Sequence, residues 1–195
     1  MNMNSIDELK AVAKANNIPI MQDGGIEFIK TYIKNNNIKD ILEIGTAVGY
    51  SAINFALTND NIKVTTIERD PTRYSEALNN IANFNLTNQI RVINADALEY
   101  EINDQFDLIF IDAAKSQYIK FFEKYKNNLK RGGVIITDNL SFHGMVEDIT
   151  LTNNRNTRQL VNKIKKYIEF LKENREFETF FYKIGDGVSV SKKLD

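Results

Sequence analysis

The chain has 195 residues, of which 43% are hydrophobic and 26% are charged, and these proportions are ordinary for a globular domain. It contains no cysteine, which excludes disulfides, zinc-thiolate centres and cysteine nucleophiles. The formal net charge of −1 gives no overall attraction to nucleic acid, so any contact with RNA would need a local basic patch.

The chain has neither a membrane-spanning pattern nor a targeting pattern. No stretch reaches the length of a membrane-spanning helix, and the first ten residues lack the pattern of a signal peptide. We therefore expect a cytoplasmic protein that makes no membrane contact. Because no linker, internal repeat or low-complexity segment interrupts the sequence, residues 1–195 are expected to form one domain.

Hydrophobic periodicity divides the chain into alternating helices and strands. Helices are expected at residues 5–16, in a segment after Gly24-Gly25, and at 51–57, 71–84, 118–129 and 160–171. Strands are expected at residues 40–44, 63–67, 90–94, 106–111, 134–137, 177–184 and 188–191. This alternation predicts a Rossmann-like α/β fold with a doubly wound, mostly parallel sheet. The turn Gly185-Asp186-Gly187 predicts an antiparallel C-terminal hairpin.

The longest stretch without regular signals is residues 140–156. A loop of this length is uncommon in a compact domain and often forms the lid of an active site. It contains His143, the only histidine, which we interpret as a lid residue and not as a catalyst. Arg155 and Arg158 border the same segment.

A glycine turn follows the first predicted strand, in the pattern Glu43-x-Gly45-x-x-x-Gly49. Glycines at such a turn allow the backbone to approach a ligand, and the next helix presents free N–H groups. Ala47 occupies the middle position of the dinucleotide pattern, so that pattern is not matched. A tight turn without a ligand explains the same residues about as well.

Acidic residues follow the next two strands. Glu68 lies 23 residues beyond Gly45 and could accept the hydroxyls of a ribose, while Asp96, followed by Ala97, could accept from an adenine amino group. A solvated strand-end carboxylate is the alternative for Glu68. Together they indicate a nucleoside pocket, without separating a nicotinamide cofactor from S-adenosylmethionine.

A second polar group follows the later strands. Asp112 ends one predicted strand, and Asp138 and Asn139 end the next, so three oxygen ligands could meet at one sheet edge. Such a set suits Mg²⁺ or another hard cation. Lys115 could act as a general base there. The alternatives are a helix N-cap for Asp112, a polar turn for Asp138-Asn139 and a surface lysine for Lys115.

Four segments carry a resemblance to a known family: Glu43-Ile-Gly-Thr-Ala-Val-Gly-Tyr-Ser51, Thr66-Ile-Glu-Arg69, Ile111-Asp-Ala-Ala-Lys115 and Thr137-Asp-Asn139. They resemble the cation-dependent O-methyltransferases of the catechol and caffeoyl-CoA type, which have the class I methyltransferase fold. Pro19-Ile-Met21 and Gly185-Asp-Gly187 resemble its bacterial branch that methylates tRNA 5-hydroxyuridine. The likeness covers residues 18–193.

The resemblance implies roles for individual residues. Lys115 and Asp112 would be catalytic, and Asp112, Asp138 and Asn139 would bind Mg²⁺. S-adenosylmethionine would contact Met21, Glu43, Gly45, Tyr50, Ser51, Glu68, Asp96, Ala97 and Asp112. The enzyme would be a homodimer.

The resemblance also implies an acceptor, 5-hydroxyuridine at the wobble position of the tRNA anticodon loop, which would become 5-methoxyuridine. A small catechol-like phenol is the alternative. Contacts to tRNA would need cations, and the candidates are Lys124, Lys126, Lys130, Arg131, Lys163, Lys165, Lys166 and Lys172. A solvated helix face is the stronger explanation for both groups. A nicotinamide oxidoreductase and a binding module without activity fit the residues less well.

Overall fold

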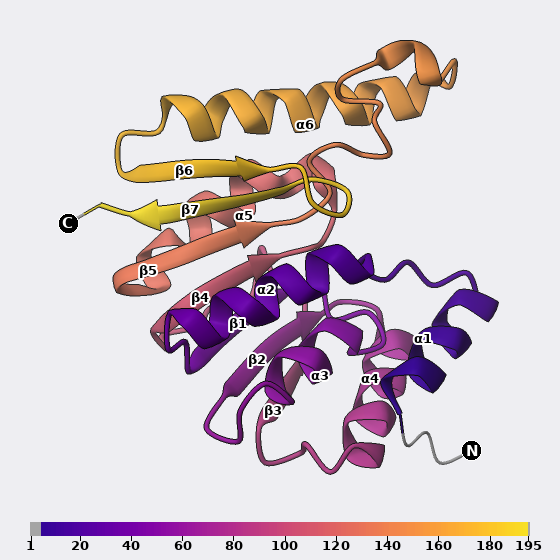
Figure 1. Cartoon of the computed structure of the whole chain (residues 1–195), viewed down its shortest axis with the longest axis vertical. Coiled ribbons are helices and arrows are strands. Elements are labelled where there is room, and N and C mark those ends of the chain that lie inside the picture. The colour runs from indigo at the N-terminus through magenta and orange to yellow at the C-terminus, as the bar shows by residue number, and fades with distance from the viewer. Residues whose placement is uncertain (1–4, 195) are drawn as a thin grey trace.

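A seven-stranded sheet runs through the part of the protein that the computed structural model describes, residues 5–194. Its strands are β1 (Asp40–Ile44), β2 (Lys63–Glu68), β3 (Ile90–Asn94), β4 (Phe106–Ile111), β5 (Leu129–Thr137), β6 (Phe177–Tyr182) and β7 (Val188–Lys193). The spatial order is β3-β2-β1-β4-β5-β7-β6 (Figure 1). Strands β1 to β5 are parallel, and β7 pairs antiparallel with both β5 and β6. The predicted sheet is therefore confirmed.

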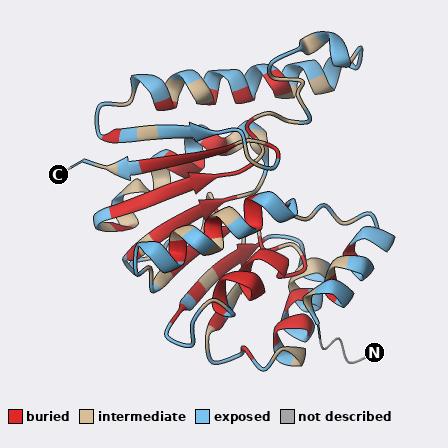
Figure 2. Ribbon diagram, viewed as in Figure 1, coloured by how far each residue is buried: buried red, intermediate tan, exposed pale blue. Residues whose placement is uncertain are grey.

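Helices cover both faces of this sheet. They are α1 (Ile6–Ala15), α2 (Asp23–Asn35), α3 (Tyr50–Ala56), α4 (Pro71–Asn83), α5 (Tyr118–Tyr125) and α6 (Arg155–Glu173), with short 3₁₀ turns at Lys115–Gln117, Lys126–Asn128 and Ile149–Leu151. Alternate residues of the central strands enter two hydrophobic clusters, one under α1, α2 and α3 and one under α5 and α6. The central strands are accordingly buried along most of their length, whereas the outer strands β3 and β6 are largely exposed or half-buried (Figure 2). Helix α3 is fully buried, and the other helices are buried along one side.

The chain between α5 and β5 differs from the sequence-based expectation. The predicted helix over residues 118–129 ends at Tyr125, and β5 begins at Leu129 instead of Val134. Gly132 and Gly133 therefore lie inside the strand and do not precede it. The pairing register between β4 and β5 shifts between Phe106 and Leu108, and this irregularity accommodates the two glycines.

Helix α6 begins at Arg155, earlier than the predicted start at residue 160. The Asn154 side chain accepts a hydrogen bond from the backbone N–H of Thr157 and caps the helix. Strand β7 inserts between β5 and β6, so β6 forms the outer edge. None of the helices within residues 5–194 combines the length and hydrophobicity needed to cross a bilayer.

Candidate active site

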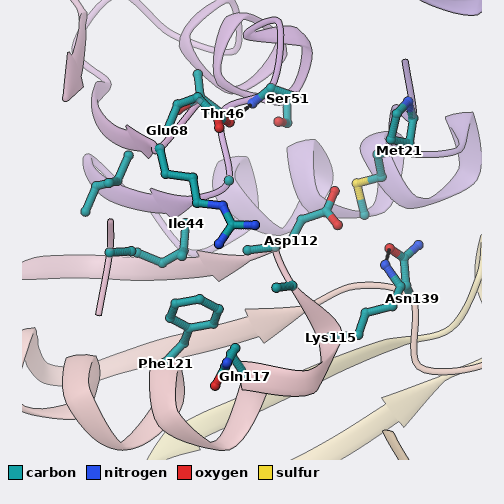
Figure 3. A pocket seen from close by; sticks show the side chains of 18 of the residues that line it. Met21, Ile44, Thr46, Ser51, Glu68, Asp112, Lys115, Gln117, Phe121 and Asn139 are labelled. Atoms are coloured by element: carbon teal, nitrogen blue, oxygen red, sulfur yellow. Dashed lines mark hydrogen bonds between the residues drawn. The ribbon is translucent and has the colours of Figure 1, made fainter. Parts of the chain in front are cut away.

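A cavity of about 510 Å³ opens at the edge of the sheet where the parallel strands end. Loops that follow β1 to β5 line it, together with the turn between β6 and β7 (Figure 3). Most of the predicted site residues lie in its wall: Met21, Gly45, Tyr50, Ser51, Glu68, Asp96, Ala97, Asp112, Lys115 and Asn139. Glu43 and Asp138 are buried behind the wall.

Gly45 allows the loops after β1 and β4 to meet. Its φ is +102°, in the region that favours glycine. A Cβ atom at this position would lie 2.2 Å from the carbonyl oxygen of Asp112. The glycine is therefore required by contact between two backbone segments, in addition to any approach of a ligand.

Glu43 is fully buried and supports the pocket from below. Its carboxyl group accepts hydrogen bonds from the hydroxyl of Ser51 and, at 2.5 Å, from Thr66 Oγ1. Burial raises the pKa of Glu43 to about 8, although these two donors oppose the shift. Because Ser51 and Thr46 line the cavity and Glu43 does not, Glu43 can act on a ligand only indirectly, through Ser51 or through Thr66 and Thr46.

The carboxylate of Glu68 is held by two backbone donors. Ala47 N donates to its Oε2 at 2.8 Å and Asp70 N to its Oε1 at 2.9 Å. Asp96 is held similarly, because Leu98 N donates to its Oδ1 at 2.8 Å. A carboxylate retains further lone pairs when it accepts such bonds, so both groups can still receive hydroxyl or amino donors from a nucleoside.

Lys115, Asn139 and Asp138 form a chain of hydrogen bonds at the other end of the cavity. Lys115 Nζ donates to Asn139 Oδ1 at 2.7 Å, and Asn139 Nδ2 donates to Asp138 Oδ2 at 3.2 Å. The other oxygen of Asp138, Oδ1, is buried without a hydrogen-bond partner. An unsatisfied buried carboxylate oxygen is costly, so a cation at this place would stabilise it.

The charges around Asp138 also favour a cation. Burial raises the pKa of Asp138 to about 7, and the negative charge of Asp112 adds to the shift. Burial likewise raises the pKa of Asp112, Lys115 opposes this, and Asp186 reinforces it. Two carboxylates and an amide oxygen suit a hard divalent ion. Within residues 5–194 no three His, Cys, Asp or Glu side chains group to hold a metal, so the amide would be needed.

Several lining residues were not predicted as site residues from the sequence. Phe142 lies in the predicted lid, and its ring centroid is 5.7 Å from Lys115 Nζ. Asp186 was expected only as a turn residue, and Arg69 and Arg73 follow Glu68 into the cavity wall. The Gly-Asp-Gly pattern was visible in the sequence, but it shows neither that Asp186 is buried nor what it faces. His143 also lines the cavity, and its side chain is 67% exposed.

A family model described as O-methyltransferase matches residues 2–194 of the chain. The chain belongs to this O-methyltransferase family. The seven-stranded sheet with its antiparallel C-terminal pair is accordingly the class I methyltransferase fold that the sequence predicted. The resemblance to the catechol and caffeoyl-CoA type is confirmed at the level of the family.

Two relatives of this O-methyltransferase illustrate the range of the family. It is 30% identical over 176 residues to a caffeoyl-CoA O-methyltransferase of Populus kitakamiensis, covering 86% of this chain and 75% of the relative. It is 33% identical over 129 residues to a catechol O-methyltransferase of Niastella koreensis, covering 63% of this chain and 58% of the relative.

Solved structures of the O-methyltransferases agree with this fold. A candidate caffeoyl-CoA O-methyltransferase of Staphylococcus aureus matches with a TM-score of 0.94 and 45% identity, over 98% of this chain and 93% of that one. An O-methyltransferase of Bacillus cereus in complex with SAH matches with a TM-score of 0.82 and 28% identity, over 97% and 90% of the two chains.

Proposed function

We propose that this O-methyltransferase transfers the methyl group of S-adenosylmethionine to an acceptor molecule with two adjacent oxygens. Both oxygens would bind one divalent cation, for which Mg²⁺ is our first choice, and one of them would receive the methyl group. The observation that carries the proposal is the buried, unpartnered Asp138 Oδ1 beside Asp112 and Asn139. The SAH bound to the Bacillus cereus relative supports the choice of methyl donor.

The cavity offers donors and acceptors for each part of the methyl donor. Glu68 would receive the ribose hydroxyls and Asp96 the adenine amino group, while Met21, Tyr50 and Ser51 would contact the remainder of the molecule. Gly45 and Ala97 would contribute close backbone approach. Asp112 would face both the methyl donor and the cation, because it lines the cavity between Gly45 and Lys115.

The catalytic residues of this chain would orient the acceptor and move its proton. Asp112, Asp138 and Asn139 would hold the cation, which when bound supplies positive charge to the acceptor oxygens. Lys115, 2.7 Å from Asn139 Oδ1, would take or share the proton of the reacting hydroxyl. Methyl transfer from a sulfonium is an in-line displacement, so fixing the acceptor oxygen supplies much of the rate.

The metal site makes a direct prediction. Asp138→Ala removes one of two carboxylate ligands, and we expect methyl transfer to fall by at least about 100-fold while the protein stays folded. Asp148→Ala, which removes an exposed carboxylate from the lid, is the control and should retain activity. Circular dichroism checks folding. Full activity of the Asp138 variant, or of the wild type in excess chelator, would exclude the cation.

For the acceptor we propose 5-hydroxyuridine at the tRNA wobble position, whose 5-hydroxyl and 4-carbonyl offer two adjacent oxygens. The base lies in a single-stranded loop, where it can be splayed out and read. The cavity is open to solvent at the sheet edge, next to the lid and the start of α6.

The charges on α6 support the tRNA acceptor more than the other predicted basic group does. Lys163, Lys165 and Lys166 are exposed and have no ion-pair partner within residues 5–194. Lys124, Lys126 and Lys130 are instead paired with carboxylates of Glu101, Glu123, Glu176, Asp40 and Asp107. Paired lysines contribute less to phosphate binding, so α6 is the better candidate surface.

A small catechol-like phenol is the second candidate acceptor. It is favoured by the named activities of the Populus and Niastella relatives. A catechol also offers two adjacent oxygens, so the same cation site would serve it. The deciding experiment compares methyl incorporation into tRNA from a strain that lacks the 5-methoxy modification with incorporation into catechols. Labelling of catechols alone would overturn the tRNA proposal.

We further propose that residues 1–195 act as one domain in a cytoplasmic homodimer. One continuous sheet with helices on both faces supports the single domain. Phe180, Phe181 and Tyr182 are exposed on the edge strand β6 and would supply apolar area for a dimer interface. Sedimentation equilibrium would measure the dimer directly, and a monomer at micromolar concentration would exclude it.

A further inference from the structure

Asp186 is a buried carboxylate in the turn between β6 and β7, and its side chain is 5% exposed. Among the described residues, no lysine or arginine forms an ion pair with it; the one basic group within 4 Å is the exposed imidazole of His143, at 3.9 Å. A buried charge with so little compensation must be held by hydrogen bonds. The hydrogen-bond partners of its two oxygens therefore indicate the role of the carboxylate.

One oxygen of Asp186 contacts the lid. The backbone N–H of His143 donates to Asp186 Oδ1 at 2.6 Å, and Ser141 N donates to the backbone carbonyl of Asp186 at 2.7 Å. Phe142 and His143 both have positive φ values, 48° and 57°, and residues other than glycine rarely adopt this backbone conformation. The bonds from Asp186 stabilise this unfavourable turn.

The other oxygen of Asp186 faces the active site. Asn139 Nδ2 donates to Asp186 Oδ2 at 3.5 Å and to Asp138 Oδ2 at 3.2 Å. With its nitrogen between two carboxylates, the Asn139 amide must direct its oxygen the opposite way, to Lys115. The absence of any three-carboxylate metal group within residues 5–194 also indicates that Asp186 does not complete the ligand set itself.

We propose that Asp186 is a positioning residue that fixes the orientation of the Asn139 amide and holds the lid turn at residues 141–144 beside Lys115. The inference rests on the proposed function in one respect, the role of Asn139 Oδ1 as a ligand. The amide orientation itself requires neither metal nor substrate. An amide free to rotate would present its NH₂ group to the cation half of the time, and a positive NH₂ end repels a cation.

The variant Asp186→Asn separates the two contacts. Its side-chain oxygen can still accept from His143 N–H, but its NH₂ group then faces the NH₂ group of Asn139, and two donors cannot bond. We expect the Asn139 amide to turn over or become mobile while the lid turn stays in place. Asp186→Ala loses both contacts. Asp186→Glu keeps the negative charge but displaces the carboxylate by one methylene group.

Four measurements on the whole protein test the proposal. In a ¹⁵N-asparagine spectrum, the side-chain amide signal of Asn139, assigned by its loss in Asn139→Ala, should shift or broaden in Asp186→Asn. Hydrogen exchange of residues 139–148 should stay near wild type in that variant and accelerate in Asp186→Ala. Affinity for Mn²⁺ alone should fall by about 10- to 100-fold in Asp186→Asn and should not be restored in Asp186→Glu. Affinity for SAH should stay within about twofold.

Asp148→Asn is the matched control, because Asp148 also accepts a backbone N–H within the lid, while its hydrogen-bond donors within residues 5–194 belong to Thr150 and not to Asn139. An unchanged Asn139 signal in Asp186→Asn, or wild-type Mn²⁺ affinity in Asp186→Glu, would overturn the proposal. Failure of the wild type to bind Mn²⁺ would contradict the proposed function, while the Asn139 signal and the lid exchange would still decide the role of Asp186.

Discussion

At the scale of single residues, two glycines with positive φ differ in what a side chain at their position would contact. Gly45 and Gly132 both have positive φ, at +102° and +71°. A Cβ on Gly45 would collide with the Asp112 carbonyl at 2.2 Å, whereas a Cβ on Gly132 would meet nothing within 4 Å. A substitution at Gly132 would therefore cause backbone strain alone, whereas a substitution at Gly45 would cause backbone strain and a steric clash.

This pair gives a stability prediction. Gly132→Ala should lose about 1 kcal/mol of unfolding free energy, because only the strained φ acts there. Gly45→Ala should lose at least about 3 kcal/mol, because the loops after β1 and β4 must also move apart. Urea denaturation measures both variants. Equal losses in the two variants would show that the contact with Asp112 is unimportant.

At the scale of elements, one buried network joins β1, β2 and α3 beneath the cavity. Glu43 on β1 accepts from Thr66 on β2 and Ser51 on α3, and Thr66 Oγ1 lies 2.6 Å from Thr46 Oγ1. Since the pKa of Glu43 rises from 4.5 to about 8, the folded protein holds this proton more tightly than the unfolded chain does. The network is therefore sensitive to pH.

The sign of this sensitivity follows from proton linkage. Between about pH 5 and 8 the folded state binds more protons at Glu43, so stability is greatest below this window and falls as pH rises through it. Glu43→Gln removes the titrating group, so the unfolding free energy should vary less with pH than in the wild type. The difference should be a few kcal/mol at most, since one pKa unit is about 1.4 kcal/mol. Thermal unfolding across this pH range measures the effect. The exposed Glu76→Gln serves as control, and identical curves for wild type and Glu43→Gln would refute the assignment.

At the scale of the whole molecule, the parallel strands place both halves of the site at one edge. The loops after β1, β2 and β3 carry the residues proposed to contact the nucleoside, and those after β4 and β5 carry Asp112, Lys115 and Asn139 (Figure 3). Helix α6 starts at this edge, beside the lid, and runs back along the sheet (Figure 1). Its exposed lysines, Lys163, Lys165 and Lys166, lie further along this helix.

The tRNA proposal predicts the effect of charge on α6. Lys163→Glu combined with Lys166→Glu should weaken tRNA binding at least about tenfold and reduce the slope of log affinity against log salt, because each lost phosphate contact removes about 0.7–0.9 from it. Methylation of a catechol should be unchanged. Lys34→Glu, an exposed site near the end of α2 at the opposite edge of the sheet, is the matched control. An unaltered salt slope in the α6 variant would rule out this surface.

The sequence by itself determined the strands, their mostly parallel arrangement and the edge at which the site residues lie. The predicted bounds of β1, β3 and β4 coincide with those in the structure. For β1 and β4 the reason is that a buried strand is a short apolar run with clear ends. Strand-end residues such as Glu68 and Asp112 then reach one cavity by topology alone.

Only the tertiary structure decided which polar residues face one another. Glu43 proved to be buried behind Ser51, Lys130 is paired with Asp40 and Asp107, and Asp186 joins the lid to Asn139. The contacts of Lys130 and Asp186 connect segments distant in sequence, and local periodicity carries no information about such pairs. The start of β5 was mispredicted for the same reason, since its early residues follow the irregular pairing with β4 and not a hydrophobic pattern of their own.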